Sequence, residues 1–201
     1  MLRKTLIILA VLLSSANSYA SLTGICFGVH GGIVSGYNNL TLEQSIKVVN
    51  SNFSLKNNMP DLGVHVIIGT LRIITIDGSV DYGWKKVAAM QGVNLTYSTL
   101  SATASIRGSI PLAILSPYVG VGAGFYRNAY SLSVSGYSYQ VVIPLPSNET
   151  KVGYLLKGGV EVHVPLFPLT PFAEFRYNHI PTSGKATHYY QALAGVTLNL
   201  P

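Results

Sequence analysis

The residues of this chain best suited to chemistry are seven charged side chains in the middle and late parts of the sequence. They are Asp77, Asp81, Arg107, Lys157, Glu161, Glu174 and Arg176. Carboxylates beside guanidinium or ammonium groups hold one another as ion pairs, or share protons in a catalytic or proton-conducting site. Their spacing matches no nucleophile elbow, phosphate-binding loop or metal-ligand motif. We therefore expect a polar structural network, with no catalytic residue, cofactor or metal site.

The histidines are the other candidates, and they are His30, His65, His163, His179 and His188. Ring nitrogens of the first three could in principle bind a metal ion. They fall in three separate stretches, so we expect structural hydrogen bonds and no convergent site. The last two flank Ser183, and His with Ser are the residue types of a hydrolase. We expect these two histidines to lie in a loop.

The charged residues belong to stretches in which apolar residues alternate with small or polar ones. Residues 117–126 show the pattern most clearly, with apolar residues at odd positions and glycine or tyrosine at even ones. A period of two is that of a β-strand whose two faces meet different surroundings. The same alternation predicts eight strands, at residues 26–35, 62–70, 73–84, 94–110, 117–126, 154–164, 172–178 and 189–200.

The position of the charges decides what surrounds the strands. All seven charged residues fall on the small or polar side, and none falls on the apolar side. A soluble barrel or sandwich has its charges outside, whereas a Lys or Arg facing lipid near the membrane midplane costs roughly 2–4 kcal/mol. We therefore predict an all-β fold, an eight-stranded antiparallel transmembrane up-and-down β-barrel. Its interior is just wide enough to be filled by side chains, so the network is expected to fill the lumen; a small-conductance pore is the alternative. The glycines at 120, 122 and 124 are expected to make room for Arg107 and Lys157.

Composition agrees with a membrane barrel. Apolar residues make up 48% of the chain and charged residues only 10%, against about 25% charged in a soluble domain. Cys26 is the single cysteine, so an internal disulfide is excluded. Residues 1–20 have the basic, apolar and small-residue regions of a secretory signal peptide, with an anchor helix as the alternative. Residues 21–201 then form the barrel domain, whose modest positive charge does not indicate nucleic-acid binding.

The predicted connections alternate in length. Those at 71–72, 111–116 and 165–170 are short, and those at 36–61, 85–93, 127–153 and 179–188 are long. Short turns at one end and long loops at the other are typical of a bacterial outer-membrane barrel with both termini in the periplasm. Loops 36–61 and 127–153 are the candidate sites for a host or surface ligand, and 128–151 is expected to prolong its two strands as a hairpin.

The segments 116–124, 171–177 and 195–200 resemble the small OmpA/OmpX-like outer-membrane barrel family, also called porin-family or opacity-type proteins. The resemblance implies insertion by the barrel-assembly machinery, contact with outer-membrane lipids including lipopolysaccharide, and a non-enzymatic role in envelope integrity or host interaction at the surface of a Gram-negative bacterium. A monomer is expected. The chain departs from the family by ending Leu200-Pro201, without a final aromatic residue. A lipid-modifying barrel of the lipid A deacylase kind is the alternative, but residues 178–183 do not match its His and Ser pattern.

Overall fold

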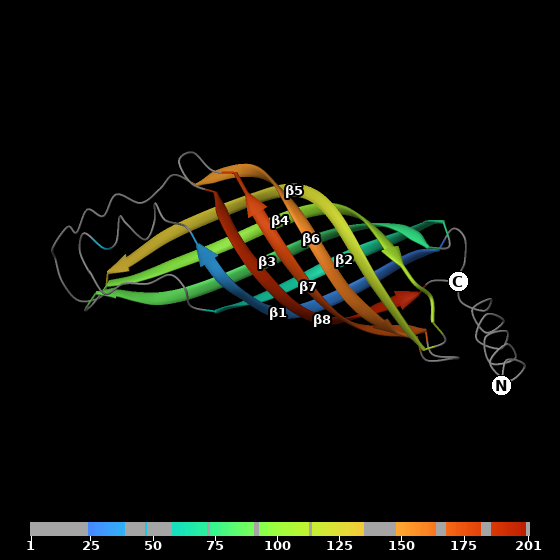
Figure 1. The fold of residues 1–201 in the computed structure, drawn as a ribbon. Coiled ribbons are helices and arrows are strands. Elements are labelled where there is room, and N and C mark those ends of the chain that lie inside the picture. Colours follow the sequence, from blue (N-terminus) through green and yellow to red (C-terminus); the bar gives the residue numbers. More distant parts are fainter. Residues whose placement is uncertain are drawn as a thin grey trace, which may run out of the picture.

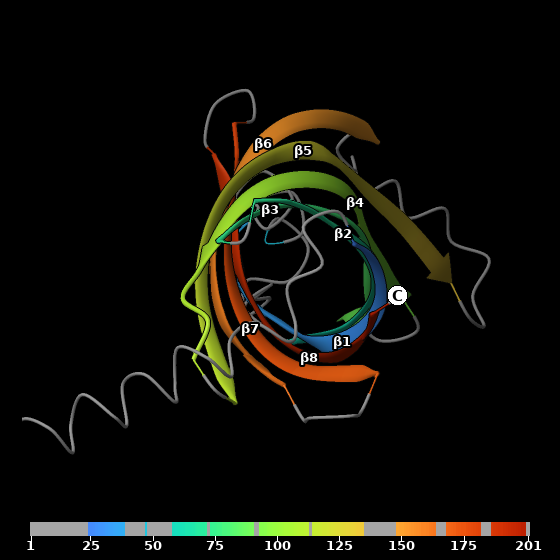
Figure 2. The same cartoon turned by 90° about the vertical axis from the view of Figure 1, so that its right-hand side faces the viewer.

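The eight expected strands are present and close into a barrel (Figures 1 and 2). The computed structural model describes residues 24–38, 47, 58–71, 73–90, 93–112, 114–134, 148–163, 168–181 and 186–199. The strands are β1 (Ile25–Asn38), β2 (Met59–Leu71), β3 (Ile74–Met90), β4 (Val93–Ser109), β5 (Leu115–Val134), β6 (Glu149–Val162), β7 (Leu169–Ile180) and β8 (Thr187–Asn199). Each pairs antiparallel with its neighbour in sequence, and β8 pairs with β1. The predicted fold class is confirmed.

The alternation of the sequence becomes an alternation between the outside and the inside of the barrel. On β5, Val119, Val121 and Phe125 are 61–69% exposed, whereas Tyr118 and Tyr126 are at most 4% exposed. Large apolar side chains are exposed in the same way on every strand of the barrel. The outer wall is therefore apolar and the inner wall polar or aromatic, the reverse of a soluble barrel.

Aromatic side chains mark one edge of this apolar wall. Tyr82 and Trp84 stack with ring centres 5.6 Å apart on β3, and Phe175 on β7 stacks with Tyr190 on β8 at 5.6 Å. This aromatic girdle lies toward the end where β1, β3, β5 and β7 finish, which we call the loop end; the opposite end is the turn end (Figure 1). Within the described ranges no helix is long and apolar enough to cross a membrane.

The strands run further toward the loop end than the alternation predicted. β3 continues to Met90 and β4 starts at Val93, so the long loop expected at 85–93 is wrong: only residues 91 and 92 separate the two strands. The expected hairpin extension of β5 and β6 is confirmed, since Asn128 pairs with Glu149. In Figure 1, β3, β4 and β5 reach furthest past the other strands. Beyond the girdle the outward residues become polar. The contrast between apolar and polar faces, from which the strands were predicted, therefore disappears there, although the strands stay paired.

A bulge near the end of β1 changes which residues face inward. Gly36 has a positive φ of 67°, a conformation that glycine adopts without strain. The pairing with β8 shifts register between Ser35 and Asn38. Both Val34 and Tyr37 consequently point into the barrel, 2% and 1% exposed, although strict alternation would put them on opposite faces.

Three predictions concern segments that lie wholly or partly outside the described residues. They are the signal peptide at 1–20 and the ligand loops 36–61 and 127–153, of which 39–46, 48–57 and 135–147 are not described.

Candidate functional site

All seven charged residues predicted for the lumen have their side chains inside the barrel, 2–7% exposed. They come from β3, β4, β6 and β7. Ion pairs and hydrogen bonds hold them in three groups. Since buried ions need partners to offset lost hydration, the partners of each side chain decide what the cluster can do.

Arg176 lies at the centre of the first group. Its Nη1 is 3.0 Å and 3.1 Å from the two carboxylate oxygens of Asp81, and its Nε donates to Glu174. Ser79 donates to Asp81 at 2.9 Å, and Ser101 lies 3.4 Å away from it. The guanidinium therefore bridges two carboxylates from opposite walls, β3 and β7.

Lys157 forms the second group. Its Nζ is 2.5 Å from Asp77 and 3.6 Å from Glu174. The hydroxyl of Tyr118 donates to Glu174 at 2.7 Å. One oxygen of Asp77, Oδ1, is buried with no hydrogen-bond partner among the described residues. Glu174 thus joins Lys157 to Arg176 and makes one continuous network of the two groups.

Arg107 and Glu161 form the third group, toward the turn end. Arg107 donates from Nη2 to Glu161 at 2.6 Å and from Nε to Thr75 at 2.9 Å. Its guanidinium lies 4.6 Å from the centre of the Tyr118 ring, a cation–π distance. His163 Nε2 is 3.6 Å from the other Glu161 oxygen. Every ion of this group has an opposite charge beside it.

A row of hydrogen-bonded polar side chains, which we call the polar chain, lies beside the network, on its loop-end side, and sequence reasoning missed it. Asp61 on β2 is 2% exposed and accepts from Gln191 at 2.5 Å; Gln191 accepts from Asn178 at 2.7 Å, and Asn178 accepts from Tyr126 at 3.0 Å. Asp61 has the same parity as His65 and shares its inward face. Extending the second predicted strand by one residue would have found it.

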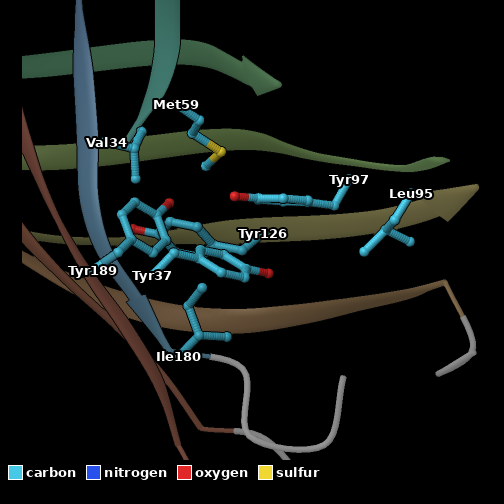
Figure 3. Close-up of a cluster of buried hydrophobic side chains, with 8 residues drawn as sticks. All are labelled: Val34, Tyr37, Met59, Leu95, Tyr97, Tyr126, Ile180 and Tyr189. Carbon is cyan, nitrogen blue, oxygen red and sulfur yellow. The ribbon is translucent and has the colours of Figure 1, made fainter. Parts of the chain in front are cut away.

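An apolar and aromatic cluster fills the lumen above this chain (Figure 3). Its members are Val34, Tyr37, Met59, Leu95, Tyr97, Tyr126, Ile180 and Tyr189. Three of them, Tyr37, Met59 and Ile180, belong to strand extensions that the alternation did not predict. The hydroxyl of Tyr97 is buried and has no partner among the described residues. Tyr97 lies beyond the girdle, opposite Lys85, and burial raises its pKa to about 12.

The histidines depart from expectation in two ways. His30 and His65 do meet, with their Nδ1 atoms 3.2 Å apart, whereas His163 lies apart beside Glu161. The pairing register of β1 and β2 brings the two together, and residue spacing alone could not reveal it. His179 and His188 are not in a loop: they lie on β7 and β8 and pair directly. In the described ranges no three His, Cys, Asp or Glu side chains are grouped to hold a metal ion.

The glycines of β5 face different neighbours. Gly120 pairs with both Arg107 and Lys157, and a Cβ placed there would lie 3.0 Å from Arg107 Cβ. At Gly122 and Gly124 it would instead meet the β4 backbone, 2.3–2.4 Å from a carbonyl oxygen. Only Gly120 therefore makes room for the two cations; the others allow close approach of β4.

Little space remains between these side chains. The gap lined by His65, Asp77, Arg107, Tyr118, Glu161, Phe172, Glu174, Arg176 and Thr197 has about 0 Å³ of room for a water molecule. A second gap, between the polar chain and the aromatic cluster, is equally small at about 0 Å³. Both spaces are too small to form a pocket for a substrate.

Charge is separated between the inside and the outside of the barrel. Five of the six acidic residues in the described ranges have buried side chains: Asp61, Asp77, Asp81, Glu161 and Glu174. The sixth, Glu149, begins β6 at the loop end. The exposed or half-buried Lys and Arg side chains in the same part of the chain are Lys47, Lys85, Lys86, Arg127 and Lys151. Lys86 and Arg127 point outward just beyond the girdle, two residues past Trp84 and Phe125. The loop end therefore has a basic exterior.

No protein-family model and no curated protein sequence matches the chain. Solved structures do match. The attachment invasion locus protein Ail of Yersinia pestis is 14% identical over 89% of this chain and 97% of its own, with a TM-score of 0.52. Neisserial surface protein A (NspA) is 16% identical over 89% of this chain and 96% of its own, with a TM-score of 0.51. The chain therefore has the fold of the small eight-stranded outer-membrane β-barrels, as its resemblance to OmpA/OmpX-like proteins implied.

Proposed function

We propose that this chain is an integral outer-membrane protein of the cell surface, with a closed lumen and no enzymatic activity, whose loop end contacts envelope or host molecules. The observation that carries the proposal is the inverted distribution of side chains. Phe125, Val119 and Ile106 are 59–69% exposed on the outside, while Arg176 and Asp81 are 2% exposed inside. In water this arrangement would leave the apolar wall uncovered, whereas hydrocarbon covers it without cost.

Gel migration tests membrane insertion. A closed barrel extracted from membranes should migrate differently with and without heating, and the signal peptide at 1–20 should be absent from the mature protein. Protease added to whole cells should cut within 135–148 and not within the turn-end connections. Loss of 135–148 only after the outer membrane is permeabilised would overturn the proposed orientation, in which both termini are periplasmic.

Conductance tests the closed lumen. The ion network and the aromatic cluster lie one above the other, and the two gaps measured between their side chains have about 0 Å³ of room for water. In planar bilayers the purified barrel should therefore show no stable open state. A large, steady conductance would refute the filled lumen and favour the pore.

The basic exterior of the loop end points to an anionic partner. Lys86 and Arg127 are exposed, whereas the side chains of Asp61, Asp77, Asp81, Glu161 and Glu174 are buried. Outer-membrane lipopolysaccharide and surface polyanions are the partners we propose, the Ail structure having been solved with a heparin analogue, sucrose octasulfate. Binding of the refolded barrel to immobilised heparin should weaken several-fold on Lys86→Glu and Arg127→Glu, and with added salt. Ser131→Glu, also outward on β5, adds one acid without removing a base and should have the smaller effect.

The absence of enzymatic activity is tested on lipid. His179 and His188 pair directly across β7 and β8, and the ion pairs of the described residues include neither of them. Lipid A from cells with and without the protein should have the same acylation. A change in acylation that disappears on His179→Ala would replace this proposal with the lipid-modifying one.

A further inference from the structure

The tripeptide Gly-Val-His occurs twice in the barrel wall, at 28–30 on β1 and at 63–65 on β2. The antiparallel register places Gly28 opposite His65, Val29 opposite Val64, and His30 opposite Gly63. The two tripeptides are thus related by a local two-fold axis through the valine pair. Both imidazoles are buried, 4% and 6% exposed.

Each imidazole lies over the glycine of the other strand. A Cβ at Gly28 would be 2.3 Å from Cε1 and Nε2 of His65, and one at Gly63 would be 2.3 Å from Nε2 of His30. Real atoms never approach so closely, so both positions need glycine for the rings to lie where they do. Phe172 packs edge-on against both rings, at 6.3 Å and 5.1 Å.

The ring nitrogens form one chain of hydrogen bonds. The two Nδ1 atoms are 3.2 Å apart, His30 Nε2 is 2.6 Å from Asp81 Oδ1, and His65 Nε2 is 3.0 Å from Thr197 Oγ1. The ring centres are 5.5 Å apart, well beyond the Nδ1 separation, so the rings meet edge to edge at these nitrogens. These hydrogen bonds run along the inner wall of the barrel, from Thr197 on β8 to Asp81 on β3.

Only a proton fits between the two Nδ1 atoms. A metal ion on the line between them would need about 2.0 Å to each nitrogen, and the observed separation is 3.2 Å. An N–H···N hydrogen bond has this length. The bond requires that one Nδ1 carry hydrogen and the other accept it.

This chain of hydrogen bonds can accept one added proton without losing a contact, but it cannot accept a second. With both rings neutral, Thr197 donates to His65 Nε2, His65 Nδ1 donates to His30 Nδ1, and His30 Nε2 donates to Asp81. An added proton on His65 Nε2 reverses only the bond to Thr197, so every contact remains. A second added proton would place two N–H groups head to head and two cations beside Arg176. The glycines and Phe172 leave the rings no room to separate.

The surrounding charges favour one added proton. Those that face the pair or its contacts are Asp61 from β2, Asp77 and Asp81 from β3, Arg107 from β4, Lys157 and Glu161 from β6, and Glu174 and Arg176 from β7. Apart from Asp61, which accepts from Gln191 on the loop-end side, and His163 beside Glu161, four carboxylates face three permanent cations. A proton shared by the histidines supplies the fourth positive charge.

We propose that His30 and His65 form a one-proton site: the pair binds a single shared proton that balances the lumen, and it admits a second only when the Nδ1 bond breaks. The unfolded chain binds a proton on each histidine below about pH 6.5, one more than the folded barrel. Stability therefore falls as pH drops through that value, and the unfolding equilibrium constant rises about tenfold per pH unit.

Nitrogen NMR of ¹⁵N-histidine-labelled barrel in lipid nanodiscs tests the site directly. The two Nδ1 signals should show coupling through the hydrogen bond, and the pair should take up one proton on acidification. Two independent titrations without coupling would overturn the proposal. This measurement uses the unaltered protein, so it does not depend on whether any variant folds.

Matched variants test the link to stability. His65→Gln should reduce the acid slope of unfolding by about one proton, whereas His163→Gln, which removes a ring outside the pair beside Glu161, should not reduce it. Gly28→Ala should abolish the Nδ1 coupling. Gly78→Ala is the control, because its Cβ would face outward 3.5 Å from Val66 Cγ1, an ordinary contact. Equal acid slopes in His65→Gln and the parent, with both proteins folded on gels, would refute the stability link.

Discussion

Removing the charge of Arg107 tests whether the lumen network holds the barrel together. Arg107 is 6% exposed and donates to Glu161 at 2.6 Å and to Thr75 at 2.9 Å. Methionine in its place keeps an unbranched, though shorter, side chain and removes all donors. Among the described residues, Glu161, 7% exposed, would then keep only His163, 3.6 Å away, as a neighbour able to carry positive charge.

The expected loss follows from the burial of the pair. Breaking a buried ion pair by removing one partner costs about 3–5 kcal/mol, because the other charge stays desolvated and unpaired. Removing both charges avoids that penalty. Arg107→Met should therefore lower the free energy of unfolding by about 3–5 kcal/mol, and adding Glu161→Gln should restore most of it, leaving a loss of about 0–2 kcal/mol.

Urea unfolding in lipid vesicles measures both values, with the single tryptophan, Trp84, as the fluorescent probe. Trp84 faces outward, 37% exposed, so its emission reports departure from lipid. Lys86→Met removes an exposed charge next to it and should change stability by no more than about 0.5 kcal/mol. A single Arg107→Met variant as stable as the parent, or a double variant no better than the single one, would show that the pair is solvated and the lumen open.

Other positions give predictions of the same kind, each read from unfolding midpoints. Tyr97→Phe should stabilise by about 1 kcal/mol, since the buried hydroxyl of Tyr97 has no partner among the described residues. The parent should lose stability between about pH 10, the pKa of an unfolded tyrosine, and about pH 12, the pKa of Tyr97 in the barrel, and the variant should not. Tyr126→Phe, which breaks a 3.0 Å bond to an amide, should destabilise by about 1 kcal/mol instead. Gly36→Ala, at φ 67°, should cost about 1 kcal/mol and Gly36→Asn less; equal losses would argue against the bulge. Gly122→Ala should destabilise far more than Gly158→Ala, whose added Cβ would lie 3.7 Å from the nearest carbonyl oxygen; similar losses would contradict close packing of β4 on β5.

The alternation of side chains predicted the strands and the inward face because the membrane enforces both. Along β5, a residue facing lipid must be apolar and its neighbour need not be, so Val119 and Gly120 differ for a physical reason. The same rule places Glu174 inside and Phe175 outside on β7, as observed. Where the membrane ends, the rule ends too. Lys86 is as much a part of β3 as Trp84, yet nothing in the alternation distinguishes it from a loop residue.

Partners inside the lumen could not be predicted, because alternation decides the face of a residue and not its register. Shifting a strand by two residues keeps every side chain on its own face but changes all its neighbours. Alternation therefore assigns His30 and His65 to the inward face but does not indicate that they touch. The bulge at Gly36 has a similar effect: it brings Tyr37 inside by a local change of backbone that a strict period of two does not contain.

The paired Gly-Val-His tripeptides disfavour a two-residue shift in register between β1 and β2, which the alternation of side chains alone would allow. A two-residue slip of β1 against β2 in one direction would oppose His30 to His65, and in the other would oppose His30 to Asp61, with every face unchanged. In the first case the two imidazoles would lie directly opposite each other and compete for the same space. In the second case no imidazole would lie over Gly28 or Gly63. Only the observed register gives each ring a glycine to lie over and each Nδ1 a partner. The proton-binding pair thus also favours the correct register where the barrel begins, so changing His30 or His65 should raise the yield of misassembled barrel as well as alter its response to acid.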